Sequence, residues 1–185
     1  VVPHAFKIIK KSVKKIFKLE VNELKQFNLK KMLKINVNIN QVGSDRIANA
    51  ISVINYKDNF IVLDFGTATT FDVVLKDTYK GGIIAPGVNL SLNTLISKAK
   101  LIPNIKLTKI KNIIGNNTQS AVKSGFYWGY KGLIDNIINM IEKETKKEFK
   151  IIFTGGLSHL FKDIINKKIK IDKDLTIKGL LKLID

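Results

Sequence analysis

The chain has 185 residues, which admits one or two domains, and its 45% hydrophobic content is enough for a packed core. Its formal net charge is +17, but the lysines are spread along the whole chain rather than gathered into a nucleic-acid-binding patch. The absence of cysteine excludes disulfides and thiolate metal sites and suits a reducing cytosol. No apolar run approaches the roughly 20 residues of a membrane-spanning helix. We therefore expect a cytoplasmic protein with no nucleic-acid or membrane partner.

The first 57 residues predict two helices and one strand. Residues 4–18 combine lysines with apolar residues at helical spacing and predict an amphipathic basic helix. A solvated helix face is the favoured interpretation, and an interfacial membrane helix or a nucleic-acid arm is the alternative. Residues 33–39 alternate apolar and polar side chains, as strands do. Ser44 is a plausible N-cap for a helix over residues 45–55, and a polar connection follows.

The remaining residues predict an α/β unit. Strands are expected over residues 60–63, 71–75, 81–85 and 149–153, and helices over 88–98, 118–146, 157–166 and 176–184.

A turn rich in hydroxyls separates the first two of these strands. It reads Asp64-Phe65-Gly66-Thr67-Ala68-Thr69-Thr70-Phe71-Asp72. Glycine lets a phosphate approach the backbone, threonine hydroxyls donate to phosphate oxygens, and an acid can hold a cation nearby. The alternative is an ordinary β-hairpin, in which threonine is common.

Arg46 is the only arginine among 32 lysines and arginines. Its planar guanidinium can grip a carboxylate through two parallel hydrogen bonds, which a lysine cannot do. Chance or a structural ion pair is the alternative interpretation. Its neighbour Asp45 lies in a predicted first helical turn, where acids are common for structural reasons alone.

Several motifs together resemble the type III pantothenate kinases. They are Gly43-Ser44-Asp45-Arg46-Ile47-Ala48-Asn49-Ala50, the 64–72 turn, Gly81-Gly82-Ile83-Ile84-Ala85-Pro86-Gly87, Ile114-Gly115-Asn116-Asn117-Thr118, Thr154-Gly155-Gly156 and Leu175-Thr176-Ile177-Lys178-Gly179-Leu180. They occur in the family's order and spacing and cover essentially the whole chain. The resemblance implies two ribonuclease H-like domains of the sugar kinase and actin superfamily. Residues 1–57 would be a remnant of the first domain, and residues 58–185 the second.

The resemblance also implies an activity: phosphorylation of pantothenate by ATP, which opens coenzyme A synthesis. Asp45 corresponds to the family's proton acceptor, and Gly43, Ser44 and Arg46 match its substrate-holding residues. Thr118 corresponds to a further substrate contact. The family implies a homodimer, and the large apolar side chains of residues 118–146 predict that this helix forms its interface.

The nucleotide side of the site follows from the same resemblance. Asp64 corresponds to a ligand of a monovalent cation, potassium or ammonium, and Mg²⁺ is expected to accompany ATP. Thr67 with Gly66 corresponds to an ATP-phosphate contact. Gly155 and Gly156 are expected to let the nucleotide approach the backbone, although a plain strand-to-helix turn is equally compatible with them.

The sequence departs from the family in three places. The family's leading Asp-x-Gly-Asn-Thr motif is absent, so we expect residues 1–57 to be loosely held without their central sheet and this chain alone to be inactive. Ser44 stands where alanine is usual, and Asn36 stands where many members have a tyrosine facing the substrate. A non-catalytic, transcription-linked relative is the alternative function, although no DNA-reading motif supports it.

Overall fold

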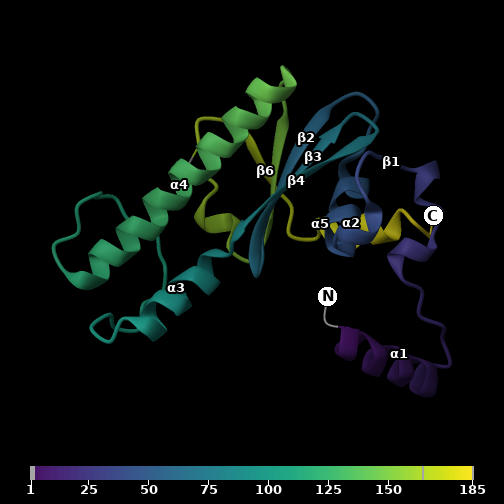
Figure 1. The fold of residues 1–185 in the computed structure, drawn as a ribbon, viewed down its shortest axis with the longest axis horizontal. Helices are drawn as coiled ribbons and strands as arrows, with labels where there is room; N and C mark the ends of the chain where they lie inside the picture. The colour runs from purple at the N-terminus through teal and green to yellow at the C-terminus, as the bar shows by residue number, and fades with distance from the viewer. Residues whose placement is uncertain (1–2, 164, 185) are drawn as a thin grey trace.

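The structure is a computed structural model that describes residues 3–163 and 165–184, and it is built around one six-stranded sheet (Figure 1). The strand order is β1-β4-β3-β2-β5-β6. Neighbours β4, β3 and β2 are antiparallel, whereas β5 is parallel to β2 and β6 to β5. This arrangement confirms the predicted ribonuclease H-like α/β fold. The strands are β1 (Lys34–Ile35), β2 (Asn59–Phe65), β3 (Ala68–Leu75), β4 (Thr78–Pro86), β5 (Lys150–Gly155) and β6 (Ile169–Ile171).

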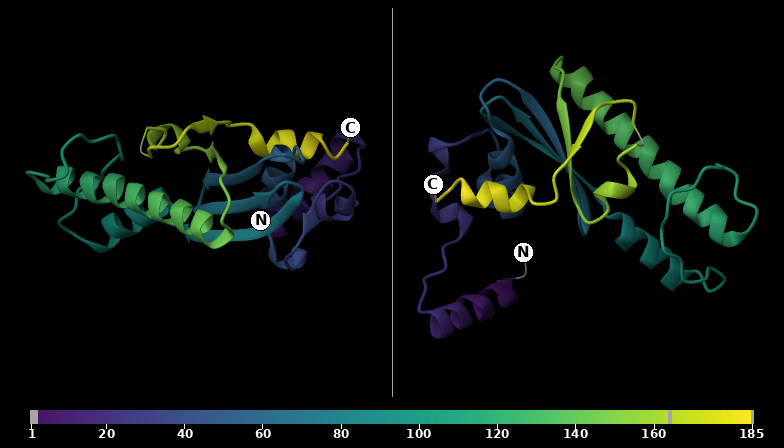
Figure 2. Two further views of the ribbon diagram at one scale, coloured as in Figure 1. Left: turned by 90° about the horizontal axis from the view of Figure 1, so that it is seen from above. Right: turned by 180° about the vertical axis from the view of Figure 1, so that it is seen from behind.

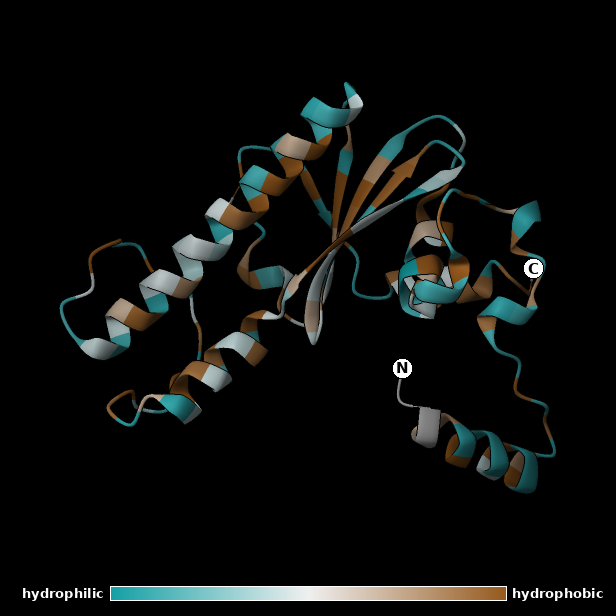
Figure 3. Cartoon of the chain, viewed as in Figure 1, coloured by the Kyte–Doolittle hydropathy of each residue, from teal (hydrophilic) through white to brown (hydrophobic). Residues whose placement is uncertain are grey.

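One face of the sheet is covered by α3 (Val88–Lys98) and α4 (Thr118–Thr145), as Figures 1 and 2 show. Alternate residues of β2, including Ile61 and Leu63, point into this core because side chains alternate along a strand. Ile134 and Ile138 of α4 meet them from the helix side. Apolar colour on the inner strands and on the sheet-facing side of α4 follows this layer in Figure 3.

The opposite face is covered by α2 (Ser44–Val53) and α5 (Leu175–Leu181). Phe60 and Val62 of β2 pack here against Ile47 and Ile51 of α2. The apolar layer ends where β2 and β3 approach their shared turn, and polar side chains take its place. The start of α2 therefore lies over a polar part of the sheet.

Most predicted elements are confirmed, and three differ. The expected strand over residues 33–39 is only Lys34–Ile35, because Asn38 accepts from the Asn40 N–H and starts a 3₁₀ turn. The expected helix over 157–166 contains only the 3₁₀ turn Ser158–Leu160, and part of it lies outside the described residues. Strand β6 was missed because three residues are too few to display a period.

Residues 24–53 are firmly part of the sheet's packing, so the expectation of a loosely held stretch over 1–57 is wrong for them. β1 pairs with β4, where the Lys34 N–H donates to the Asp77 carbonyl at 2.8 Å and the Asn36 N–H to the Tyr79 carbonyl at 3.1 Å. Leu33 and most of α2 are buried in the same core as β2 and β3. The division expected at residue 57/58 therefore does not coincide with a break in packing, and where the domains divide stays a prediction.

Helix α1 (Pro3–Phe17) confirms the predicted basic helix and lies apart from the sheet (Figures 1 and 2). Most of its lysines are exposed, and so are its larger apolar side chains, Ile8, Ile9, Ile16 and Phe17. Across residues 3–163 and 165–184, no helix is long and apolar enough to cross a membrane.

Candidate active site

The four residues Gly43-Ser44-Asp45-Arg46 form the start of α2. Gly43 is the N-cap residue, so the prediction that Ser44 caps this helix is wrong: Ser44 and Asp45 are the first two helical residues. Asp45 is exposed, and its Oδ1 accepts from the Arg46 N–H at 2.9 Å. A Cβ at position 43 would lie 2.4 Å from that same Oδ1, so glycine leaves room for the carboxylate.

Arg46 reaches from α2 to the sheet, where it meets Asp72 of β3. Its Nε donates to Asp72 Oδ1 at 2.7 Å, and its Nη2 lies 2.7 Å from the same oxygen. Tyr79 of β4 also donates to this oxygen at 2.7 Å. Burial raises the pKa of Asp72 to about 6, although the Arg46 charge and the Tyr79 hydrogen bond pull it down. The ion pair, which was the alternative interpretation of Arg46, is therefore present.

Asp64 lies at the end of β2, beside the turn. Its Oδ2 accepts from Asn49 Nδ2 of α2 at 3.3 Å, and the side-chain Oδ1 of Asn49 accepts from the Thr176 hydroxyl of α5 at 2.7 Å. Burial raises the pKa of Asp64, and the Asp45 charge raises it further, whereas the Asn49 hydrogen bond lowers it. The negative charge of Asp45, on α2, therefore acts on the carboxylate of Asp64, on β2.

The turn between β2 and β3 borders an open cleft of about 480 Å³. Gly66 and Thr67 line one side of it, and Gly156 lines the other, after β5. Asn89 and Leu90, in the first turn of α3, complete the wall. The Gly66 N–H is already bonded to the Ala68 carbonyl at 3.1 Å, so Gly66 contributes space rather than a donor.

Gly155 brings β5 against Asp64. It has φ +83°, a conformation that favours glycine, and a Cβ there would lie 2.5 Å from Asp64 Oδ1. In the sheet register Asp64 stands between Thr70 of β3 and Thr154 of β5. The buried Thr70 hydroxyl has no hydrogen-bond partner within the described part of the chain. An acid, a free hydroxyl and an open glycine turn thus lie at one corner of the sheet.

Thr118 is not brought to this corner. It is an exposed first residue of α4, and the start of that helix lies at the far side of the sheet from α2 (Figure 1). The N-cap is Asn117, whose side chain accepts from the Ser120 N–H at 2.8 Å, so Thr118 is the first helical residue and not the cap.

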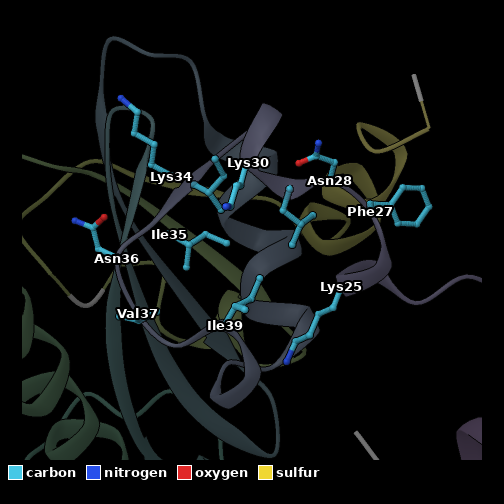
Figure 4. A pocket seen from close by; sticks show the side chains of 11 residues that line it. Lys25, Phe27, Asn28, Lys30, Lys34, Ile35, Asn36, Val37 and Ile39 are labelled. Carbon is cyan, nitrogen blue, oxygen red and sulfur yellow. The ribbon is translucent and has the colours of Figure 1, made fainter.

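Asn36 lines a separate hollow of about 590 Å³ beside β1 (Figure 4). Its apolar lining includes Leu29, Leu33 and Ile35, and Lys25, Lys30 and Lys34 line it as well. None of the predicted catalytic or nucleotide-binding residues lines this hollow.

Sequence reasoning missed four polar residues of the site: Asn49, Asp72, Tyr79 and Thr176. The signal for Asp72 was present, since an acid in the middle of an apolar strand needs a buried partner and the chain has a single arginine. The signals for the others were weaker, because each depends on a contact between distant segments.

Comparison with known proteins identifies the family. The family model described as type III pantothenate kinase matches residues 1–140. The type III pantothenate kinase of Pelagibacter ubique is 62% identical over 182 residues, which are 98% of this chain and 73% of that protein. The chain belongs to the type III pantothenate kinase family.

Two more distant family members agree. The type III pantothenate kinase of Sulfurihydrogenibium is 43% identical over 97% of this chain and 72% of its own length. That of Cereibacter sphaeroides is 46% identical over 76% of this chain and 55% of its own length. A solved structure titled as a putative Baf family transcriptional activator from Campylobacter jejuni has the same fold, with a TM-score of 0.60 at 24% identity. That match covers 90% of this chain and 79% of the other.

Proposed function

We propose that this chain carries substrate-holding and nucleotide-holding residues of a pantothenate kinase, which transfers the γ-phosphoryl group of ATP to pantothenate. The observation that carries the proposal is the corner where the start of α2 meets the β2–β3 turn. There Asn49 of α2 bonds Asp64, and Asp45 stands one helical turn before Asn49. Arg46 reaches Asp72 from the same helix, and the glycine-lined cleft borders the turn that follows Asp64. The product, 4'-phosphopantothenate, starts coenzyme A synthesis.

Asp45 is the proposed proton acceptor. Its exposed carboxylate at the start of α2 is suited to orienting the substrate's primary hydroxyl and taking its proton late in transfer. Phosphoryl transfer depends mostly on positioning and charge stabilisation, so a carboxylate is sufficient in this role. Gly43 and Ser44 would line the substrate beside it.

Arg46 is the proposed polar anchor for pantothenate. Two of its nitrogens face Asp72, but a guanidinium carries five N–H donors, so donors remain for a second partner. Its side chain is 12% exposed, which leaves a narrow route for contact with a ligand.

The nucleotide is expected to lie over Gly66, Thr67, Gly155 and Gly156. Asp64 would hold a monovalent cation, potassium or ammonium. No group of three or more His, Cys, Asp or Glu side chains lies together in the described residues, so an ion here would depend on neutral oxygens as well. When bound, the monovalent cation would offset the negative charge of the ATP phosphates. Mg²⁺ is expected to bind together with ATP.

A homodimer is the proposed assembly. Most large apolar residues of α4 are used by the core, which weakens the argument that the helix is apolar on two sides. Its exposed side instead carries Ala121, Gly125, Gly129 and Gly132 at helical spacing. A second copy packed on this side would bring a Thr118 toward the partner's substrate site. The expected cytoplasmic location stays a prediction.

The full-length protein, incubated with ATP, Mg²⁺, potassium and pantothenate, tests the proposal. Mass spectrometry should detect 4'-phosphopantothenate and an equal amount of ADP. ADP formation without phosphorylated pantothenate would show that this site serves another acceptor. Absence of both products from a protein that binds ATP would favour a non-catalytic relative.

A further inference from the structure

Asp72 and Tyr79 form a buried acceptor for Arg46 on the sheet face beneath α2. Asp72 is fully buried, and both Arg46 Nε and the Tyr79 hydroxyl donate to its Oδ1 at 2.7 Å. Its Oδ2 has no hydrogen-bond partner among the residues described. A buried carboxylate is costly unless it is paired, so these two donors determine whether Asp72 stays charged.

The surroundings leave the guanidinium little freedom. A Cβ at Gly82, the residue opposite Asp72 on β4, would lie 2.5 Å from Arg46 Nη2 and 1.9 Å from the Phe71 carbonyl oxygen. The guanidinium therefore lies in a space that exists because residue 82 has no side chain. With Nε and Nη2 turned toward Asp72, the remaining edge of the guanidinium points away from Asp72.

We propose that Asp72 and Tyr79 are positioning residues that hold Arg46 at the angle needed to bind the substrate's polar end. The inference rests on the proposed function, because it takes Arg46 as the substrate anchor. Asp72 does not touch substrate: it acts by fixing Arg46, and with it the first turn of α2 that carries Asp45. Tyr79 acts one step further back, by stabilising the Asp72 carboxylate.

This arrangement makes substrate binding depend on the charge of Asp72. The groups that face Asp72 are Arg46 and Asp45 from α2 and Tyr79 from β4. With a pKa of about 6, Asp72 is ionised at pH 8 and pairs with Arg46, whereas acid protonates it and releases the guanidinium. Pantothenate affinity should therefore fall as the pH drops through about 6.

Calorimetric titration of pantothenate into the full-length protein between pH 5 and 8 tests the proposal. Tyr79→Phe removes one hydrogen bond to the carboxylate, so the acid fall in affinity should move to higher pH by about one unit. Asp72→Asn should bind about tenfold more weakly at pH 8 and lose the acid fall near pH 6, provided it folds. Tyr130→Phe is the matched control, because its hydroxyl donates to the Pro86 carbonyl on the opposite face of the sheet.

The outcomes are distinct. The positioning role is supported if pantothenate affinity falls at a higher pH in Tyr79→Phe than in wild type, and at an unchanged pH in Tyr130→Phe. A hydroxyl with a merely structural role would change only the stability of the protein. Identical affinity profiles for wild type and Tyr79→Phe would overturn it, whether or not Asp72→Asn folds. Failure of the wild type to bind pantothenate at any pH would instead contradict the proposed function.

Discussion

Asp64 and Asp72 lie on the same face of the sheet, yet their surroundings give them different chemistry. Asp64 is at the rim, with one weak hydrogen bond from Asn49 at 3.3 Å, so part of its carboxylate is free to bind a ligand. Asp72 is inside, held by Arg46 and Tyr79 and closed to solvent. The rim acid suits ion binding, and the inner acid suits holding another side chain in place.

Replacing Arg46 with lysine should weaken pantothenate binding although the charge is preserved. An ammonium is a point donor that cannot face Asp72 and the substrate in two fixed directions, as a guanidinium does. We expect an affinity loss of about tenfold, close to one hydrogen bond to a charged group, by calorimetry on the full-length protein. Unchanged affinity would reduce Arg46 to a structural partner of Asp72.

Removing the Asp64 carboxylate should abolish the response to monovalent cations together with most activity. Asp64 borders the turn between β2 and β3, and a cation there would offset the charge of bound ATP. Turnover of the full-length protein and of Asp64→Ala should be compared in sodium and in potassium buffers. Equal wild-type rates in the two salts would contradict the cation assignment.

Residues adjacent in sequence were predictable, and residues paired across the fold were not. The first turn of α2 and the β2–β3 turn were found because each is a short run with its own chemistry. Thr176 and Asn49 are 127 positions apart, and only the packing of α5 on α2 brings them together. A single sequence carries no signal for such a pair.

At the scale of elements, α5 is fixed to α2 by backbone proximity. A Cβ at Gly179 would lie only 1.8 Å from the Ala48 carbonyl oxygen, so the two helices touch where residue 179 has no side chain. This contact, together with Thr176, explains the Leu175–Leu180 motif that the sequence singled out without a role. Helix α5 thus supports the helix that carries Asp45 and Arg46.

The substitution Gly179→Ala should destabilise the protein by about 1–3 kcal/mol, as overpacking of a close contact does. The matched control is Gly132→Ala in α4, where a Cβ would meet no atom within 4 Å. Alanine there should stabilise the helix by roughly 0.5–1 kcal/mol. Urea unfolding of both variants measures the difference, and equal stabilities would contradict the packing described for α5.

Strand β1 gives a second test at this scale. The Lys34 N–H donates to the Asp77 carbonyl just before β4, and the Asn36 N–H to the Tyr79 carbonyl of β4. Because bonds to one neighbour alternate along a strand, the intervening Ile35 N–H is expected to have no partner on β4. Hydrogen exchange followed by NMR should show slow exchange at residues 34 and 36 and faster exchange at 35. Fast exchange at all three would mean that β1 does not belong to the sheet.

The strand pattern shows what local periodicity can predict. β2, β3 and β5 were predicted because their apolar runs are long and bounded by turn residues. The alternation over residues 33–39 correctly predicted a strand but overestimated its length, because the Asn38 side chain accepts from the nearby Asn40 N–H and starts a turn. Periodicity does not report such side-chain competition.

At the scale of the whole molecule, the exposed glycine side of α4 is the proposed dimer contact. A Cβ at Gly129 would meet no atom within 4 Å in the described part of the chain, so Gly129→Glu should leave the fold intact while placing a charge at the interface. We expect sedimentation at micromolar concentration to show a dimer for the full-length protein and a monomer for the variant. Asn93→Glu on exposed α3 is the control. A dimer that survives Gly129→Glu would place the contact elsewhere.

The central claim is that the start of α2 performs phosphoryl transfer to pantothenate, and Asp45→Asn in the full-length protein tests it most directly. Asparagine keeps the shape of the side chain but cannot accept the hydroxyl proton, and a positioned base is typically worth about 10²–10⁴-fold in rate. We predict a loss of turnover in that range, measured as 4'-phosphopantothenate formed at saturating ATP, with ATP affinity nearly unchanged. Turnover close to that of the wild type would show that Asp45 is not the proton acceptor and would contradict this account of the site.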